Sequence, residues 1–169
     1  MPRIFVALPL PHDACDALAR DAKALSRYDM LARFTPSTNL HITLAFLGEV
    51  PMLKAQRLSA ALRPLSRVLP REISLGRLGL FERTRVLWAG LTPAESLDAL
   101  AQEVRRILDE MELNYDRKPF KAHITLARNW RRPLPYVTLP ARSFRLTPPI
   151  VLASDIDQRT NQVRYRQIY

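Results

Sequence analysis

The chain has 169 residues and an apolar fraction of 47%, enough to bury a core as one domain or as two small lobes. It contains no run of about eighteen apolar residues, and its apolar N-terminal stretch is short, interrupted by proline and without a small-residue cleavage site. These features argue against a transmembrane helix and a signal peptide. The single cysteine, Cys15, excludes an internal disulfide and predicts a protein of the reducing cytoplasm.

The net charge of +10 arises from 26 basic and 16 acidic residues. Arginine carries the excess, because only four of the basic residues are lysines. A guanidinium group binds phosphate oxygens through two parallel hydrogen bonds, which an ammonium group does not. The composition therefore favours a polyanionic partner such as nucleic acid or a nucleotide. A basic protein without such a partner is the alternative.

Hydrophobic periodicity predicts alternating strands and helices in the first part of the chain. Residues 3–10 form an apolar run of strand length, and residues 12–26 form a helical pattern. The apolar positions of that helix are Ala14, Leu18, Ala22 and Leu25. A further helix is predicted over 52–63, ending before a proline, and a further strand over 72–80.

The second part of the chain repeats this order. Residues 85–91 predict a strand, and residues 92–111 predict a helix. Thr92 and Glu95 have the spacing of a capping box, and Pro93 suits the first helical turn. The buried stripe of this helix is predicted to contain Leu97, Leu100, Val104 and Ile107 or Leu108.

The C-terminal region reads as a proline-rich connection followed by a hairpin. Residues 131–149 contain five prolines and four arginines, which disfavours a central strand or a helix interior. We interpret this segment as a connecting loop with an edge strand, and a basic rim that faces phosphate is the alternative. Residues 149–169 are typical of a hairpin that turns near 159–161.

An internal repeat links the two parts. The pentapeptide HITLA begins at His41 and again at His123, an offset of 82 positions (123 − 41). The same offset aligns 3–11 with 85–93 and the tetrapeptide DALA at 16–19 with its copy at 98–101. Three blocks in one register indicate a single domain made of two related halves, 1–80 and 81–169.

Each HITLA copy is predicted to display histidine and threonine together. Successive side chains of a strand point to opposite faces. Ile42 and Leu44 therefore face the core, while His41 and Thr43 face the other way. The second copy repeats this arrangement with His123 and Thr125 on the open face and Ile124 and Leu126 on the buried face. Two related halves can bring both displays to one cleft.

Such a cleft suits the chemistry of a phosphodiester. Two imidazoles with ordinary pKa values of about 6.5 can serve as general base and general acid near neutral pH. Threonine hydroxyls donate hydrogen bonds to phosphate oxygens, and the guanidinium of Arg128 adds a fork for the phosphate. Strict alternation places Arg128 on the opposite face from Thr125, so its role requires a twist or an end of the strand.

Other chemistries have weaker signals. A zinc site needs two further ligands besides the histidines, and no H-E-x-x-H, C-x-x-C or carboxylate cluster offers them. Cys15 lies in a helical pattern as a small apolar residue, no G-x-S-x-G occurs, and there is no P-loop. His12 is interpreted as a surface residue at a helix start. We therefore expect no metal and no cofactor.

Paired H-x-T motifs resemble the two-histidine (2H) phosphoesterase superfamily. The segments NLHITLAFLGEV, RTRVLWAG and RKPFKAHITLAR are similar to the RNA 2′,3′-cyclic phosphodiesterases, also called 2′-5′ RNA ligases. This resemblance covers nearly the whole chain. It implies a bilobal α+β fold with two pseudo-symmetric lobes, each an antiparallel sheet with outer helices, and an active-site cleft between them.

The resemblance also implies an activity and roles. A terminal 2′,3′-cyclic phosphate of RNA is opened to a 2′-phosphomonoester without metal. His41 would donate a proton to the leaving 3′ oxygen, and His123 would accept a proton from water. The phosphate oxygens would be held by Thr43, Thr125 and Arg128.

Several alternatives stay open at this stage. One is reversible joining of RNA through a 2′,5′ bond, and another is hydrolysis of small cyclic nucleotides or of an ADP-ribose cyclic phosphate. A third is a non-catalytic module that binds RNA ends through the two histidines. We expect a cytoplasmic monomer whose partner is RNA with a 2′,3′-cyclic phosphate end or a small cyclic nucleotide, and no contact with a membrane.

Overall fold

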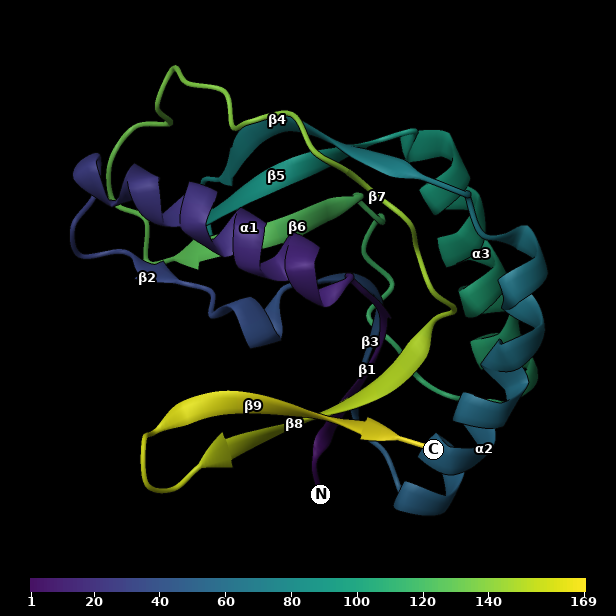
Figure 1. The fold of residues 1–169 in the computed structure, drawn as a ribbon. Coiled ribbons are helices and arrows are strands. Elements are labelled where there is room, and N and C mark those ends of the chain that lie inside the picture. The colour runs from purple at the N-terminus through teal and green to yellow at the C-terminus, as the bar shows by residue number, and fades with distance from the viewer.

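The computed structural model describes residues 1–169 and contains two antiparallel sheets with helices on their outer sides (Figure 1). The first sheet has the order β3 (His41–Glu49), β1 (Arg3–Pro9), β8 (Ile150–Asp157) and β9 (Gln162–Ile168). The second has the order β2 (Arg33–Phe34), β6 (His123–Arg128), β5 (Val86–Thr92), β4 (Ile73–Phe81) and β7 (Ser143–Phe144). The expected α+β architecture with two antiparallel sheets is confirmed.

Three α-helices flank the sheets. Helix α1 (His12–Lys23) contacts β2 of the second sheet. Helices α2 (Met52–Leu62) and α3 (Ala94–Glu110) contact each other and cover the first sheet, α2 through β8 and β9 and α3 through β3. Short 3₁₀ helices follow α1 and α2 and precede β3, at Ala24–Arg27, Arg63–Val68 and Ser37–Asn39. No helix is long and apolar enough to cross a membrane.

The chain crosses between the sheets, so neither sheet belongs to one half of the sequence. Strands β8 and β9, from the C-terminal end, join β1 and β3 in the first sheet. Strand β4, which ends the first half, pairs with β5 in the second sheet. The helices cross between the sheets in the same way. Helix α1, from the first half of the sequence, contacts the second sheet, and α3, from the second half, contacts the first sheet. The division into related halves at about residue 80 remains a prediction, and its halves do not coincide with the lobes.

The strand registers correct the alignment of the repeat by one residue. Ala7 of β1 lies opposite Thr43, whereas Trp88 of β5 lies opposite Thr125. The first strands of the two halves therefore correspond at an offset of 81 (88 − 7), and the HITLA strands at 82. A shift of one residue moves every side chain of a strand to its other face. Trp88, rather than Ala89, thus shares a face with the second histidine motif.

The predicted helix start at Thr92 is also wrong. Thr92 is the last residue of β5 and lies opposite Ser74 of β4, and α3 begins after Pro93 without a side-chain cap. The Thr92 hydroxyl donates instead to the Ser74 carbonyl oxygen at 3.5 Å. The local sequence pattern predicted a helix cap at Thr92, but strand pairing holds this residue in the sheet. The helix predicted over 52–63, the C-terminal hairpin and the edge strand within 131–149 are confirmed.

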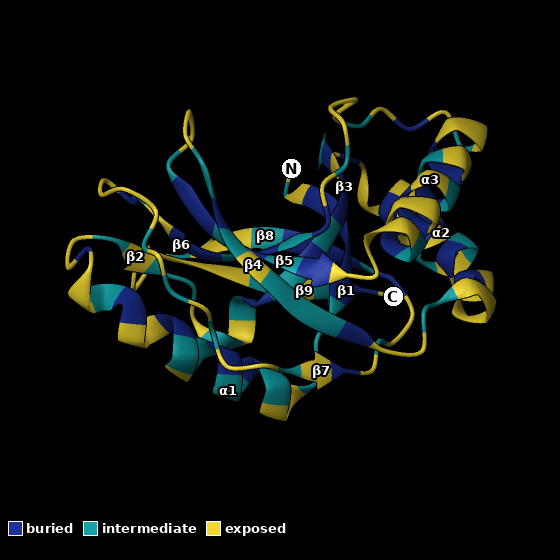
Figure 2. Ribbon diagram, turned by 90° about the horizontal axis from the view of Figure 1, so that it is seen from above, coloured by how far each residue is buried: buried dark blue, intermediate teal, exposed yellow.

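The buried core supports both motif strands. Ile42, Leu44, Ile124 and Leu126 are all at most 2% exposed and belong to one continuous cluster with the apolar faces of the three helices. On α1 the buried residues are Cys15, Leu18 and Ala22, while Ala14 is only partly buried. Figure 2 shows the helices alternating between buried and exposed residues along their length. Burial of apolar surface contributes about 25 cal/mol per Å² to stability, and this free energy fixes the face that each motif strand turns toward the core.

Candidate active site

A bulge interrupts each HITLA strand at the same position. In β6, Thr125 lies opposite Trp88 and Ala127 opposite Leu87, so Leu126 has no partner residue. In β3, Leu44 is left unpaired in the same way, between Thr43 opposite Ala7 and Ala45 opposite Val6. A bulge places two residues against one and resets the alternation beyond it.

The bulge explains how Arg128 reaches the site. Leu126 and Ala127 are both buried, so the next residue, Arg128, returns to the open face that carries Thr125. Strict alternation had placed Arg128 on the opposite face. The corresponding residue of β3 is Phe46, which is 46% exposed and stacks on Phe5 with ring centroids 5.4 Å apart. The two halves thus differ here, with a cation in one and an aromatic ring in the other.

Both histidines have the same tautomer. The Nδ1–H of His41 donates to the carbonyl oxygen of Asn39 at 2.7 Å, and the Nδ1–H of His123 donates to that of Lys121 at 2.6 Å. A carbonyl oxygen only accepts, so the proton resides on Nδ1 in each neutral ring. The acceptor in each ring is therefore Nε2.

The two Nε2 atoms have different surroundings. Nε2 of His41 lies 2.9 Å from the hydroxyl oxygen of Thr43. Nε2 of His123 makes no hydrogen bond within the protein, and Thr125 instead uses its carbonyl oxygen to accept a bond of 2.9 Å from the Thr35 hydroxyl. One imidazole is held at both nitrogens, and the other has a free acceptor.

Aromatic rings surround each imidazole. Phe5 and Tyr165 lie 5.2 and 5.1 Å from His41, measured between ring centroids, and Tyr165 meets the imidazole edge to face. Phe81 lies 5.1 Å from His123, also edge to face. Such contacts restrict rotation of the imidazole and exclude water from its faces.

The environment lowers the pKa of both histidines. Burial is the main cause for each ring, because it disfavours the charged form. The positive charge of Arg128 adds to the effect at both rings, and the charge of His123 adds to it at His41. Lys121 lowers the pKa of His123 through its charge. Strands β3 and β6, which carry the two imidazoles and Arg128, contact each other.

A cavity of about 410 Å³, called here the histidine cleft, opens beside His41 and Arg128. His41 comes from the first sheet, and Thr125 and Arg128 come from the second. Tyr165 on β9 and Arg33 on β2 complete its walls. The side chain of Asn39 ties the cleft to the C-terminal hairpin by donating to the Val163 carbonyl oxygen at 2.8 Å. The cleft therefore offers the imidazole of His41, the hydroxyl of Thr125 and two guanidinium groups to an anion of nucleotide size. Thr43 and His123 do not line it, although His123 precedes Thr125 by two residues on β6.

Some residues of the site have no recognisable pattern in the sequence. Asn39 and Lys121 hold the imidazoles through backbone carbonyls, which every residue type supplies. Tyr165 and Trp88 reach the histidines only through strand pairing between distant segments. The structure contains no group of three or more histidine, cysteine or carboxylate side chains arranged to hold a metal ion.

Comparison with known proteins agrees with this geometry. Residues 11–152 match the 2′-5′ RNA ligase superfamily. The chain belongs to this superfamily. The resemblance to the two-histidine phosphoesterases is thereby confirmed.

Curated relatives of this chain are named RNA 2′,3′-cyclic phosphodiesterase. An RNA 2′,3′-cyclic phosphodiesterase of Geobacillus stearothermophilus is 32% identical over 157 residues, which is 88% of this chain but only half of that protein's length. The RNA 2′,3′-cyclic phosphodiesterase of Escherichia coli K12 is 31% identical over 156 residues, covering 84% of this chain and 88% of the relative.

Solved structures share the fold over almost the full length. The crystal structure of E. coli LigT complexed with 3′-AMP superimposes with a TM-score of 0.77 at 28% identity, covering 99% of this chain and 95% of the other. The crystal structure of TT0787 of Thermus thermophilus gives 0.73 at the same identity and coverage. The fold with two antiparallel sheets is therefore similar to that of these proteins.

Proposed function

We propose that this protein is an RNA 2′,3′-cyclic phosphodiesterase that opens a terminal 2′,3′-cyclic phosphate to a 2′-phosphomonoester. The observation that carries the proposal is the meeting of two H-x-T strands at one cleft with different hydrogen bonding at their Nε2 atoms. The names of the relatives from G. stearothermophilus and E. coli support the same substrate. The complex of E. coli LigT with 3′-AMP supports a nucleotide in the cleft.

The assignment of the base follows from the free acceptor. Nε2 of His123 has a lone pair and no partner in the protein, so it can take a proton from a water molecule. The water oxygen then forms a bond to phosphorus, in line with the bond to the 3′ oxygen. His123 leaves the step as an imidazolium ion, which its hydrogen bond to the Lys121 carbonyl stabilises.

His41 is then the acid. In its protonated form, Nε2–H donates to the Thr43 hydroxyl in the free protein. On substrate binding, the leaving 3′ oxygen takes the place of that hydroxyl and receives the proton as its bond to phosphorus breaks. The Thr43 hydroxyl is released to donate to a phosphate oxygen. A bound phosphate anion raises the pKa of His41, opposing the effect of burial.

Charge on the phosphate is balanced by the second sheet. Thr125 and Arg128 line the cleft next to His41, and their side chains can donate to the two oxygens that do not take part in the displacement. Proton transfer and charge stabilisation are then both supplied by side chains, so we propose a reaction that requires no metal ion.

The test is hydrolysis of a short RNA that ends in a 2′,3′-cyclic phosphate, measured with EDTA present. We expect turnover to the 2′-phosphate, and we expect His41→Ala and His123→Ala each to lose about 10²–10⁴-fold in rate. The matched control is His12→Ala, because this third histidine lies on α1 with its side chain 87% exposed. RNA that binds without turnover would point to a non-catalytic end-binding module, and activity that EDTA abolishes would refute the metal-free reaction.

A further inference from the structure

A second cavity, of about 950 Å³, lies beyond the histidine cleft between the turn 27–31 and the segment 131–136. We call it the arginine–tyrosine groove after Arg27, Arg131, Arg132 and Tyr136 in its walls. No residue of this groove takes part in the chemistry described above.

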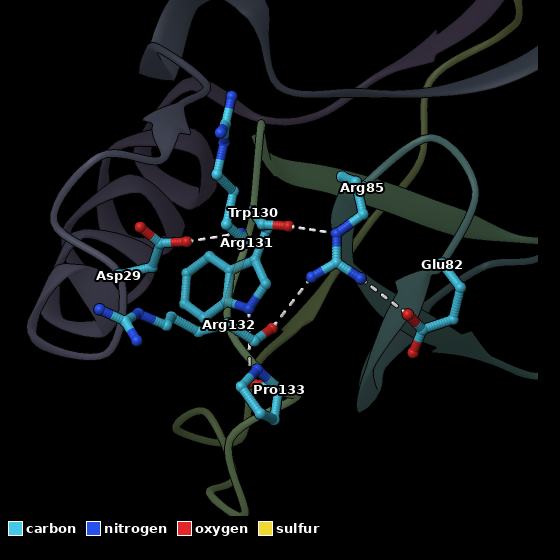
Figure 3. A network of polar contacts seen from close by, with 7 residues as sticks. All are labelled: Asp29, Glu82, Arg85, Trp130, Arg131, Arg132 and Pro133. Carbon is cyan, nitrogen blue, oxygen red and sulfur yellow. Dashed lines mark hydrogen bonds and ion pairs between the residues drawn. The ribbon is translucent and has the colours of Figure 1, made fainter.

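Hydrogen bonds hold the backbone of the groove from two sides (Figure 3). On one side, the buried carboxylate of Asp29 accepts hydrogen bonds from the backbone N–H groups of Leu31 at 3.1 Å and Arg131 at 2.6 Å. The bond from Arg131 is the main cause of the lowered pKa of Asp29. On the other side, the guanidinium of Arg85 donates to the carbonyl oxygens of Trp130 at 2.6 Å and Arg132 at 3.3 Å. The walls of the groove are therefore held in place by hydrogen bonds from the side chains of Asp29 and Arg85 to the main chain.

These contacts leave the groove positively charged. Asp29 is its only acidic residue, and that carboxylate is turned toward backbone N–H groups. The guanidinium of Arg132 makes no hydrogen bond or salt bridge, and that of Arg131 bonds only the neutral side chain of Asn129. Arg27 lies over the ring of Tyr28 at 4.9 Å. Three guanidinium groups are thus available to a polyanion.

Exposed apolar side chains stand among these charges. The ring of Tyr136 is fully exposed, and Met30 and Leu31 are 85% and 77% exposed. An exposed ring beside guanidinium groups is a platform on which an unpaired base can stack. In a duplex the bases are already stacked on one another, so this combination selects a single strand.

The groove lies close to the histidine cleft along the chain. Arg33 of β2 pairs with Arg128 of β6, and both line the cleft. Leu31 precedes Arg33 by two residues and Arg131 follows Arg128 by three, so the chain spans at most about 7 and 11 Å to reach the groove. The other cavity beside His41, of about 380 Å³, contains neither lysine nor arginine. A phosphate backbone that leaves the cleft toward the groove meets arginines, whereas the cavity beside His41 offers none.

We propose that the arginine–tyrosine groove binds single-stranded RNA immediately 5′ of the reacting end. This inference rests on the proposed function, because it takes the RNA end to lie in the histidine cleft. Arg131 and Arg132 contact phosphates, and a base stacks on Tyr136. The groove thereby makes an RNA strand a better substrate than a mononucleotide with the same cyclic phosphate.

The experiment compares the wild type with the variant Arg131→Ala/Arg132→Ala/Tyr136→Ala. Because Asp29 and Arg85 hold the backbone of this segment, removal of these side chains leaves their bonds in place. A control variant, Arg63→Ala/Arg67→Ala/Tyr169→Ala, removes the same side-chain types from exposed positions elsewhere. Binding is measured by fluorescence anisotropy with a labelled single-stranded RNA ending in a 2′-phosphate, over a series of salt concentrations.

We expect the groove variant, and not the control, to bind this RNA at least about fivefold more weakly. The slope of log affinity against log salt should fall in magnitude by about 1.4 for two lost phosphate contacts. The kcat/KM for a 2′,3′-cyclic mononucleotide, which is too short to reach the groove, should stay unchanged.

Two results would overturn the inference. One is RNA binding by the groove variant that equals that of the control, and the other is an equal loss on the mononucleotide. A second pair isolates stacking: Tyr136→Ala should weaken binding, while Tyr136→Phe should not. If the wild type hydrolyses neither substrate, the proposed function fails, while the binding comparison still decides whether the groove holds RNA.

Discussion

Nε2 of His41 is hydrogen-bonded to the hydroxyl of Thr43, 2.9 Å away, two residues along the same strand. The second motif has no such bond, and Nε2 of His123 is free. The repeat therefore supplies two imidazoles that have the same tautomer but differ in the hydrogen bonding of their Nε2 atoms. In the proposed mechanism, this asymmetry makes His41 the acid and His123 the base.

The first prediction concerns the hydroxyl of Thr43. Thr43→Val removes the partner of His41 Nε2 and one donor to the phosphate, so kcat should fall about tenfold, less than on loss of either histidine. Thr43→Ser keeps the hydroxyl and should retain most of the activity. Steady-state kinetics on a cyclic-phosphate substrate decides the matter, and a Thr43→Val enzyme with wild-type kcat would contradict the assigned contact.

The second prediction concerns pH. Burial lowers the pKa of both imidazoles below the ordinary 6.5. The reaction needs His41 protonated and His123 neutral, so kcat/KM should rise as His123 loses its proton and fall as His41 loses its own. Because both pKa values lie below 6.5, the maximum of the bell should lie below pH 6.5 as well. A flat profile between about pH 5 and 8 would exclude acid–base catalysis by this pair.

The third prediction distinguishes the effect of Arg128 on the pKa values of the histidines from the effect of Lys121. The charge of Arg128 lowers the pKa of both histidines, so Arg128→Gln should raise both. Lys121 lowers only the pKa of His123 by its charge, and Lys121→Gln keeps the backbone carbonyl that holds this ring. NMR titration of the imidazole C–H signals measures each pKa. Unchanged values in Arg128→Gln would mean that the guanidinium does not face the cleft.

The fourth prediction concerns Gly79 on β4. A β-carbon at this position would overlap the indole of Trp88, which lies edge to face against His123 at 6.2 Å. Gly79→Ala should displace the indole and lower kcat through His123 while the protein stays folded. Adding Trp88→Phe makes room for the new methyl group and should restore part of the rate. Circular dichroism and kinetics on the three variants check this, and full activity of Gly79→Ala would contradict it.

The sequence was sufficient for features that depend on local periodicity. Alternation correctly predicted that Ile42, Leu44, Ile124 and Leu126 are buried and that each histidine shares a face with its threonine. The energetic reason is direct, because turning the strand over would expose two large apolar side chains for each motif.

Features that depend on pairing between distant strands could not be read from the sequence. The position of Arg128 depends on a bulge that exists only relative to β5. Thr92 had the pattern of a helix cap, yet its pairing with Ser74 keeps it in a strand. Tyr165 comes to His41 because the C-terminal hairpin joins the first sheet, a crossing for which the repeat gave no sign.

A change of leaving group distinguishes the proposed acid, His41, from the proposed base, His123. In a cyclic substrate with sulfur in place of the bridging 3′ oxygen, the leaving thiolate has a pKa of roughly 8.5 and needs no proton donor. We predict that His41→Ala loses far less activity on this substrate than on the oxygen substrate. His123→Ala should lose as much on both. A smaller loss of activity for His123→Ala than for His41→Ala on the sulfur substrate would contradict this assignment of acid and base. The same would follow if each variant lost as much activity on the sulfur substrate as on the oxygen substrate.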